Sequence, residues 1–428
     1  MLRKIFLVVS VFLALSFASI ASAAELIRVA LVEKQATVEL SCSDDFVVSN
    51  AQGSQVLPKG KYFAHLQNGR LQLDDAHSFS GPLTVTAQPD KALPQVNRRS
   101  YQGSLQLRVE ENALLVINQL PLEAYLASVL PAKTMVVWPD EVIKAQAIAA
   151  RTYALYKKQH STAAYDISAT DSELPYEGTG SRIEKNGITK LIKATAGQYL
   201  IDASGLAIEA VTTSSSGGHT ESAAQLWGRD ISYLQGVVDY DSDSPEYSWE
   251  YRATPAILEG LLAQRGYVVG KLNSILLSPL NEKSVDRTAT GRVKYVILTG
   301  EAGTAKVTGS ELAQLLGLNS TLFDVETGTP VPETLKVPIE NYYGMEIGSK
   351  DIDIKVNEDN RPVWRNLVRS YHLLSGGKEE KIIFKGKGKG EGLGLSAWGA
   401  RGLANSDEKA TYMTILAHYY AGARLVSR

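Results

Sequence analysis

Hydrophobic and polar residues alternate along the first part of the chain. Residues 26–32 and 105–109 alternate with a period of two, which is typical of strands that bury one face. Residues 113–117 form an apolar run of strand length. Glycine, Asn and Asp residues separate these runs, as the turns between short strands require. The pattern predicts a small β-rich domain over residues 24–112.

The pattern changes after residue 117 to one that favours helices. Residues 121–130 are helix-like, with Pro121 in the first turn. A second helix is expected to open at Trp138-Pro139-Asp140-Glu141 and to run to Tyr156, because acidic residues stabilise the positive end of a helix. Small residues of this helix share one face, which permits another element to approach closely. They are Ala145, Ile148, Ala149 and Thr152.

The remainder of the chain mixes both kinds of element. We expect strands at 207–211 and 293–298, helices at 255–265, 309–316 and 409–420, and an irregular Ser- and Gly-rich loop at 212–221. These elements predict an α+β fold: the small N-terminal β domain is followed by a mixed α/β core formed by residues 113–253 and 384–428. Residues 254–383 are expected to form a mixed α/β lobe inserted into that core, with extra loops.

Glycine recurs at every second position from Gly386 to Gly394. In an extended chain these glycines share one face, which another backbone or a flat ligand can approach closely. A tightly packed strand and a ligand-facing strand both remain open as interpretations. A phosphate-binding loop is excluded, because the run contains no G-x-x-x-x-G-K-[ST] motif.

The first segment has the features of a secretory signal peptide. Arg3 and Lys4 precede an apolar run, and Ala21-Ser22-Ala23 provides the small residues of a cleavage site. The alternative is an uncleaved membrane anchor, but the apolar run is shorter than the roughly 20 residues that a span needs. We therefore expect residues 1–23 to be removed and the protein to be exported to the periplasm, cell wall or extracellular space, with no membrane span after cleavage.

Charge and cysteine content narrow the choice of partner. The 44 Lys and Arg residues nearly balance 46 Asp and Glu residues, so the net charge is -2 and no basic surplus favours nucleic acid. Cys42 is the single cysteine and the chain has six histidines, which exclude a disulfide framework and argue against a metal centre. We expect no metal, no cofactor and no nucleic-acid partner.

Four segments together resemble the family of stage II sporulation protein D and amidase enhancer (LytB). They are residues 117–126 (INQLPLEAYL), 138–154 (WPDEVIKAQAIAARTYA), 214–221 (SSSGGHTE) with 226–228 and 233–234, and 386–400 with 418–422. The resemblance implies a protein that acts on peptidoglycan. Enzymes of this family are lytic transglycosylases, in which a glutamic acid protonates the glycosidic oxygen and a hydroxyl of the sugar closes an anhydro ring.

The chain departs from the family pattern at the catalytic position. The family's glutamate stands five residues before the aromatic residue that matches Trp138, and this chain has Lys133 there. Lysine has a reference pKa of about 10.4 and is a poor proton donor at neutral pH. Glu391 and Ala397 occupy places where the family has histidine and glutamine. The stretch 166–176 lacks the Cys and His that bind zinc in some members, so we predict no such zinc site.

The resemblance also implies which residues bind substrate. The residues expected to bind the glycan are Trp138, Arg151, Ser216, Gly217, Gly218, His219, Gly390, Gly392, Ser396 and Trp398. Glu391 is the candidate for a replacement acid, and a solvated strand residue is the other interpretation of this position. His219 can instead form hydrogen bonds within its own loop. A Ser-His-Asp triad is disfavoured because the chain has no G-x-S-x-G elbow.

Two functions follow from the resemblance. The first is a protein that binds peptidoglycan glycan strands, with weak or no lytic activity because Lys133 replaces the glutamate, and with a cell-wall amidase as a possible partner. The second is an active lytic transglycosylase that cleaves peptide-free strands with another carboxylate such as Glu391. A secreted adhesin, the third class considered, lacks support from repeats or cysteines.

Overall fold

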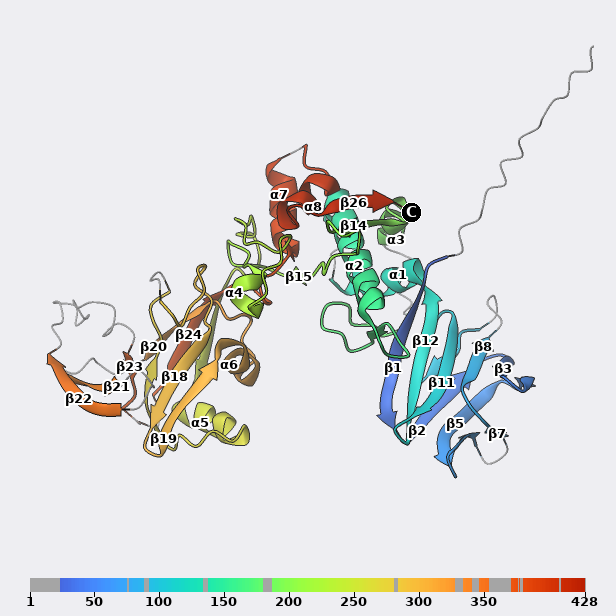
Figure 1. Cartoon of the computed structure of the whole chain (residues 1–428), viewed down its shortest axis with the longest axis horizontal. Helices are drawn as coiled ribbons and strands as arrows, with labels where there is room; N and C mark the ends of the chain where they lie inside the picture. Colours follow the sequence, from blue (N-terminus) through green and yellow to red (C-terminus); the bar gives the residue numbers. More distant parts are fainter. Residues whose placement is uncertain are drawn as a thin grey trace, which may run out of the picture.

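The computed structural model of the chain describes residues 24–74, 77–87, 92–133, 138–179, 187–280, 284–327, 334–340, 346–353, 371–375, 377, 380–407 and 409–427. The expected signal peptide, residues 1–23, lies outside these ranges. The fold is α+β, as predicted. In Figure 1, the N-terminal sheets and a second β-rich lobe lie on opposite sides of a group of helices.

Two antiparallel sheets form the N-terminal β-rich region. The larger has the order β13 (Ile167–Ser168), β1 (Leu26–Gln35), β12 (Ala113–Pro121), β11 (Ser104–Glu110), β8 (Leu83–Ala87), β3 (Phe46–Asn50), β4 (Gly53–Leu57), with β13 parallel to β1. The smaller has the order β10 (Arg99–Ser100), β9 (Gln95–Val96), β2 (Thr37–Cys42), β5 (Gly60–Gln67), β6 (Arg70–Leu73), β7 (His77–Phe79). The strands predicted at 26–32, 105–109 and 113–117 are confirmed.

Helix α2 is the centre of the helical group. The helices there are α1 (Leu122–Lys133), α2 (Asp140–His160), α3 (Ile188–Ala194), α7 (Ala397–Ser406) and α8 (Tyr412–Tyr419), whereas α4 (Ala223–Trp227) lies beside the lobe (Figure 1). Every residue of α2 from Val142 to Leu155 except Lys144 is buried, including the predicted face of small residues. This burial on all sides explains why α1, α3, α7 and α8 can pack around it.

The ends of the predicted helices shift for local reasons. Helix α1 begins directly after Pro121 and α2 continues to His160. Helix α8 begins at Tyr412 rather than at 409, because the Thr411 side chain accepts a hydrogen bond from the Thr414 backbone N–H and Thr414 reciprocates in a capping box.

The second lobe has a hydrophobic core of its own. Its sheets have the orders β16 (Ser248–Ala253), β24 (Ile382–Lys387), β20 (Phe323–Thr327), and β19 (Gly303–Thr308), β18 (Tyr295–Gly300), β17 (Leu272–Leu276), β23 (Tyr371–Leu373). A further pair is β21 (Thr334–Glu340) with β22 (Glu346–Asp353). The predicted helices are present as α5 (Pro255–Gln264) and α6 (Gly309–Leu316). The strand predicted at 293–298 begins at Tyr295.

One large hydrophobic cluster joins the N-terminal sheets to the helices, and a separate cluster fills the lobe. Strand β16 ends at the expected start of the lobe, and β24 crosses its expected end at residue 383. The two strands pair with each other and contribute to the lobe's cluster. The domain boundaries at 112, 253 and 383 stay predictions.

Two short pairs of strands connect the C-terminal part of the chain to segments next to the helices. Strand β14 (Gln198–Ile201) pairs with β26 (Arg424–Ser427), and β15 (Thr212–Thr213) runs parallel to β25 (Leu395–Ser396). The strand predicted at 207–211 is wrong: Ala207 makes an isolated bridge to Ile201, and the segment then becomes irregular before β15.

The prediction of one glycine face between Gly386 and Gly394 is also wrong. Strand β24 ends at Lys387, and the next four glycines of the series, at 388, 390, 392 and 394, have φ values of +73°, +102°, +80° and +65°. Left-handed residues at alternate positions turn the chain repeatedly, so it cannot stay extended. The glycines pack closely against the protein instead: a Cβ on Gly394 would lie 2.0 Å from the Val211 carbonyl oxygen.

Candidate functional site

Two loops that are distant in sequence lie side by side next to the helices. The Ser- and Gly-rich loop after β15 and the glycine-rich loop after β24 exchange two backbone hydrogen bonds, between Ser215 and Lys389. Gly390 N–H also donates to the Asn319 carbonyl of the lobe at 2.9 Å. The loops are therefore fixed to each other, and the glycine-rich loop is also fixed to the lobe.

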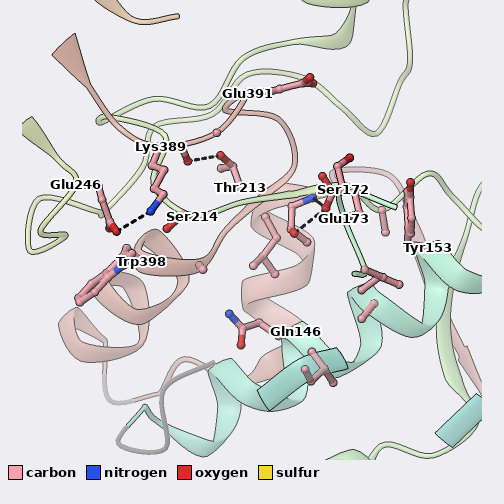
Figure 2. A pocket seen from close by; sticks show the side chains of 18 of the residues that line it. Gln146, Tyr153, Ser172, Glu173, Thr213, Ser214, Glu246, Lys389, Glu391 and Trp398 are labelled. Carbon is pink, nitrogen blue, oxygen red and sulfur yellow. Dashed lines mark hydrogen bonds and ion pairs between the residues drawn. The ribbon is translucent and has the colours of Figure 1, made fainter. Parts of the chain in front are cut away.

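A cavity of about 480 Å³ lies between these loops and the helices α1 and α2. Figure 2 shows it with Trp398 on one side and Tyr153 on the other. Of the residues expected to bind substrate, the structure places four at this cavity when Glu391 is counted with them: Trp138, Gly390, Glu391 and Trp398. Other lining residues are Leu130, Gln146, Ser172, Glu173, Thr213, Ser214, Glu246 and Lys389.

The two tryptophans of the cavity have different roles. Trp138 is only 5% exposed and belongs to the core, and its ring meets Trp398 edge-on with the centroids 5.5 Å apart. Trp398 is half-buried, and the Arg401 guanidinium lies 5.1 Å from its ring centroid. The backbone N–H of Trp398 donates to the Ser214 carbonyl at 3.0 Å, which fixes the residue to the opposite loop. Trp398 is thus the more accessible aromatic surface.

Lys133 lies in the segment that joins two cavity residues. It is the last residue of α1, and the chain passes from Leu130 to Trp138, both of which line the cavity. The side chain of Lys133, together with residues 134–137, lies outside the described part of the structure.

The described carboxylates of the cavity are held in different ways. Glu173 accepts hydrogen bonds from the Thr212 backbone N–H at 3.0 Å and from the Thr212 hydroxyl at 2.9 Å. Glu246 is paired with Lys389 at 3.4 Å. Glu391 is exposed, and Figure 2 shows its side chain directed away from Trp398. Two of the three carboxylates are therefore bound to other protein groups.

Tyr153 supplies a neutral polar group to the cavity. Burial, with a further contribution from the negative charge of Asp171, raises the pKa of the Tyr153 hydroxyl far above its usual range. The hydroxyl donates to the Asp171 carboxylate at 3.2 Å. It therefore stays protonated under physiological conditions.

Arg151 and Ser396 do not line the cavity. Arg151 is 1% exposed and pairs with Glu123 through Nε–Oε1 and Nη2–Oε2 distances of 2.7 and 2.8 Å. Its Nη1 also donates to the Gln198 carbonyl at 3.0 Å, so it joins α2 to α1 and β14. Ser396 is buried and caps α7 by accepting from the Gly399 N–H at 3.1 Å. The contacts of both residues indicate a role in stabilising the fold.

The Ser-Gly-Gly turn wraps around a buried carboxylate. Asp241 accepts hydrogen bonds from the Ser215 hydroxyl and from the backbone N–H groups of Gly217 and Gly218, at 2.5, 2.8 and 2.9 Å. Ser216 donates its hydroxyl to Asp239 and is fully buried. The turn is thus held by two aspartates that sequence reasoning did not select.

His219 makes no triad with these serines. Its Nδ1 lies 2.6 Å from the Thr220 carbonyl oxygen, and its backbone pairs with Val238. Among the described residues, no hydrogen bond joins His219 to a serine, so the geometry fits the alternative of bonding within its own segment.

Gly392 lies against an arginine of the lobe rather than in the cavity. The buried Arg292 donates to the Ser216 carbonyl at 2.8 Å and to the Gly390 carbonyl at 3.3 Å, so it contacts both loops. Burial lowers the pKa of Arg292 to about 10. Sequence reasoning did not select Arg292, whose hydrogen bonds to these loops are with backbone carbonyl groups.

No metal site is evident in the ranges that the structure describes: no group of three or more His, Cys, Asp or Glu side chains there is arranged to hold an ion. Within the same ranges, no helix is long and apolar enough to cross a membrane.

The central part of the chain matches a known protein family. A family model described as Stage II sporulation protein matches residues 110–201, from the end of β11 to the end of β14. The resemblance to the stage II sporulation protein family is confirmed. The matched segment includes Lys133, Trp138 and all of α2, whereas the lobe and the glycine-rich loop lie outside it.

Relatives extend the similarity beyond that segment. The chain is 24% identical over 402 residues to the amidase enhancer of Bacillus subtilis, covering 92% of this chain and 52% of that protein. It is 26% identical over 226 residues to stage II sporulation protein D of Bacillus subtilis, covering 49% of this chain and 61% of that protein. An uncharacterized protein of Brachyspira hyodysenteriae is 26% identical over 335 residues, or 77% of this chain and 73% of its own length. The chain thus spans about half the length of the amidase enhancer.

Proposed function

We propose that this protein binds peptidoglycan glycan strands at the cell envelope, with weak or no lytic activity. The similarity to stage II sporulation protein D and to an amidase enhancer supports a cell-wall-associated function. One observation carries the finer proposal: a lysine, Lys133, ends α1 in the segment between Leu130 and Trp138, which both line the cavity.

The lining of the cavity suits a sugar chain. Trp398 offers a half-buried aromatic face, against which the apolar side of a sugar ring can pack. Tyr153, Ser172 and Ser214 add neutral hydrogen-bonding groups. Sites for small polar ligands commonly combine apolar surface with a few polar groups in this manner.

We expect weak or absent cleavage because the described residues of the cavity offer no well-placed acid. Lytic cleavage needs a carboxyl group, in a poorly solvated place, that protonates the oxygen between two sugars. Lysine replaces the family's glutamate, and Glu173 and Glu246 are already bound to Thr212 and Lys389. Glu391 lines the cavity, which favours the second candidate function, an active transglycosylase, but its side chain is exposed.

The partner and the compartment are part of the same proposal. One relative carries the name amidase enhancer, so a cell-wall amidase is the proposed protein partner. The signal-peptide features of residues 1–23 support export to the periplasm, cell wall or extracellular space.

The test is a digest of peptide-free glycan strands followed by mass spectrometry. We expect the wild-type protein to retain these strands in a pull-down and to release little anhydro-sugar product. Lys133→Glu should produce anhydro ends if the rest of the site is intact. Lys133→Gln is the matched control, because it removes the positive charge without supplying a carboxyl group.

Two results would contradict the proposal. Abundant anhydro ends from the wild type, abolished by Glu391→Gln, would establish the transglycosylase instead. Failure of the wild type to retain glycan strands would exclude both functions.

A further inference from the structure

A second cavity adjoins the first. It has a volume of about 530 Å³ and lies between α4 and α6, on the side of the lobe. Lys389, Gly390 and Glu391 line both cavities. The glycine-rich loop is therefore a shared wall between them.

Hydrogen bonds fix the shared wall in place, and the wall is thin at Gly390. Gly390 N–H donates to the Asn319 carbonyl at 2.9 Å, and the Ser320 hydroxyl donates to the Lys387 carbonyl at 2.6 Å. Gly390 itself has no side chain, and its φ of +102° together with a Cβ position only 2.5 Å from Thr213 Oγ1 disfavours any other residue. Only backbone therefore separates the two cavities at this position.

Like the first cavity, the second combines a half-buried tryptophan with uncharged polar groups. Trp227, at the end of α4, is half-buried and lines it, with the Arg229 guanidinium 4.9 Å from its ring centroid. Gln314 and Asn319 supply uncharged amide groups. The charged lining residues, Lys389 and Glu391, have opposite signs and belong to the shared wall.

The residues that line the second cavity favour an uncharged sugar over a polyanion as ligand. A polyanion would need a surplus of positive charge, which the cavity lacks. Amide and hydroxyl groups beside an aromatic ring instead match the hydroxyl and acetamido groups of N-acetylated amino sugars. From the shared wall and the matching chemistry we infer that the second cavity binds the continuation of the glycan strand that occupies the first. This inference rests on the proposed function and adds a second subsite, on the lobe, to it.

A two-cavity groove makes affinity depend on strand length. A strand that fills both cavities gains contacts that a shorter strand cannot reach, so its dissociation constant should be lower. Loss of an aromatic contact should weaken the binding of long strands about tenfold. Loss of one amide hydrogen bond should weaken it about threefold. Strands that fill only the first cavity should be unaffected by either change.

The experiment measures the binding of peptide-free glycan strands of graded length to the purified full chain. Trp227→Ala and Gln314→Ala are expected to reduce the gain in affinity with length, by about tenfold and about threefold, whereas Trp398→Ala should weaken the binding of strands of every length. Gln314 is exposed on α6, so its substitution should leave folding intact even if Trp227→Ala does not. Gln264→Ala, at an exposed position on α5, is the matched control.

The outcomes separate this inference from the proposed function. Wild-type binding that increases with length, unchanged in both second-cavity variants, would overturn the inference and leave the proposed function standing. The same measurement is made with strands that retain stem peptides. If the second-cavity variants lose affinity only for those strands, the second cavity binds peptide and the inference is overturned. Absence of wild-type binding at every length would refute both.

Discussion

Arg292 lies directly against Gly392: a Cβ carbon placed on Gly392 would be 2.1 Å from Nη2 of the guanidinium. The arginine comes from the lobe, and the glycine from the loop that returns to the helices. Because Arg292 also donates to the Ser216 and Gly390 carbonyls, it joins the lobe to both loops.

Gly392→Ala should therefore destabilise the protein by about 3 kcal/mol or more, since steric overlap adds to the strain of a φ of +80°. Urea denaturation measures the loss in the free energy of unfolding. Gly205→Ala is the control: its φ is +84° and a Cβ there would meet nothing within 4 Å, so only backbone strain of about 1 kcal/mol is expected. Equal losses in the two variants would show that the Arg292 contact has no effect.

Ser214 and Ser216 should respond in opposite ways to substitution by alanine. Ser216 is buried and bonded to Asp239, so Ser216→Ala should lower the free energy of unfolding by about 1–3 kcal/mol while the folded protein still binds glycan. Ser214 is half-buried and lines the cavity, so Ser214→Ala should weaken glycan binding with little loss of stability. Denaturation and binding are measured on the same preparations. A specific loss of binding in Ser216→Ala would instead favour the substrate-binding role expected from the sequence.

The two tryptophans of the first cavity provide a second contrast. Trp138→Ala removes a ring that is 5% exposed and should lower the free energy of unfolding by about 3–5 kcal/mol. Trp398→Ala should mainly weaken glycan binding, and Trp398→Phe should restore part of it because an aromatic face is kept. Binding that is unchanged in a folded Trp398→Ala variant would exclude Trp398 as a sugar-binding surface.

Glu141 makes part of the stability dependent on pH. Burial opposes ionisation, but hydrogen bonds from Lys144 Nζ at 2.6 Å and from the Tyr412 N–H at 2.8 Å outweigh it and lower the pKa of Glu141 from its usual 4.5. The ionised group therefore stabilises the folded state above pH 4.5, and this contribution is lost as the pH falls through the lowered pKa.

Glu141→Gln should reduce the acid-dependent part of the free energy of unfolding by up to about 1 kcal/mol, because the group is near the surface. Denaturation curves collected above and below pH 4.5 measure this. Lys144→Gln should act in the same direction, since it removes the strongest interaction that lowers the pKa. Parallel pH profiles for wild type and Glu141→Gln would contradict the assignment.

Periodicity predicts the regular elements well where burial follows a single pattern. Strand β1 alternates and α2 carries a buried face of small residues, and both lie where the sequence places them. The glycine-rich loop could not be predicted, because its conformation depends on partners such as Val211 and Arg292 that are remote in sequence. The apolar residues of the segment 207–211 are buried, although its backbone does not continue a sheet.

The site is predictable to a more limited extent. Trp138, Gly390, Glu391 and Trp398 line the first cavity, whereas Arg151, Ser216 and Gly392 pack inside the protein. A family motif contains residues that stabilise the loops as well as residues that face a ligand, and the motif alone does not distinguish the two. Asp241 and Arg292 escaped selection because their contacts are with backbone groups of other segments.

The burial of α2 has a consequence for the order in which the chain can fold. Leu393, Leu395, Ile415 and Tyr419 belong to the same hydrophobic cluster as α2, and Glu141 at its start holds the backbone of Tyr412. Synthesis proceeds from the N-terminus, so the helix is made long before these partners exist. The N-terminal sheets, α1 and α3 can pack early, but the side of α2 that contacts α7 and α8 stays uncovered until residues 393–427 have emerged. Completion of the core is therefore timed by the last part of this sequence.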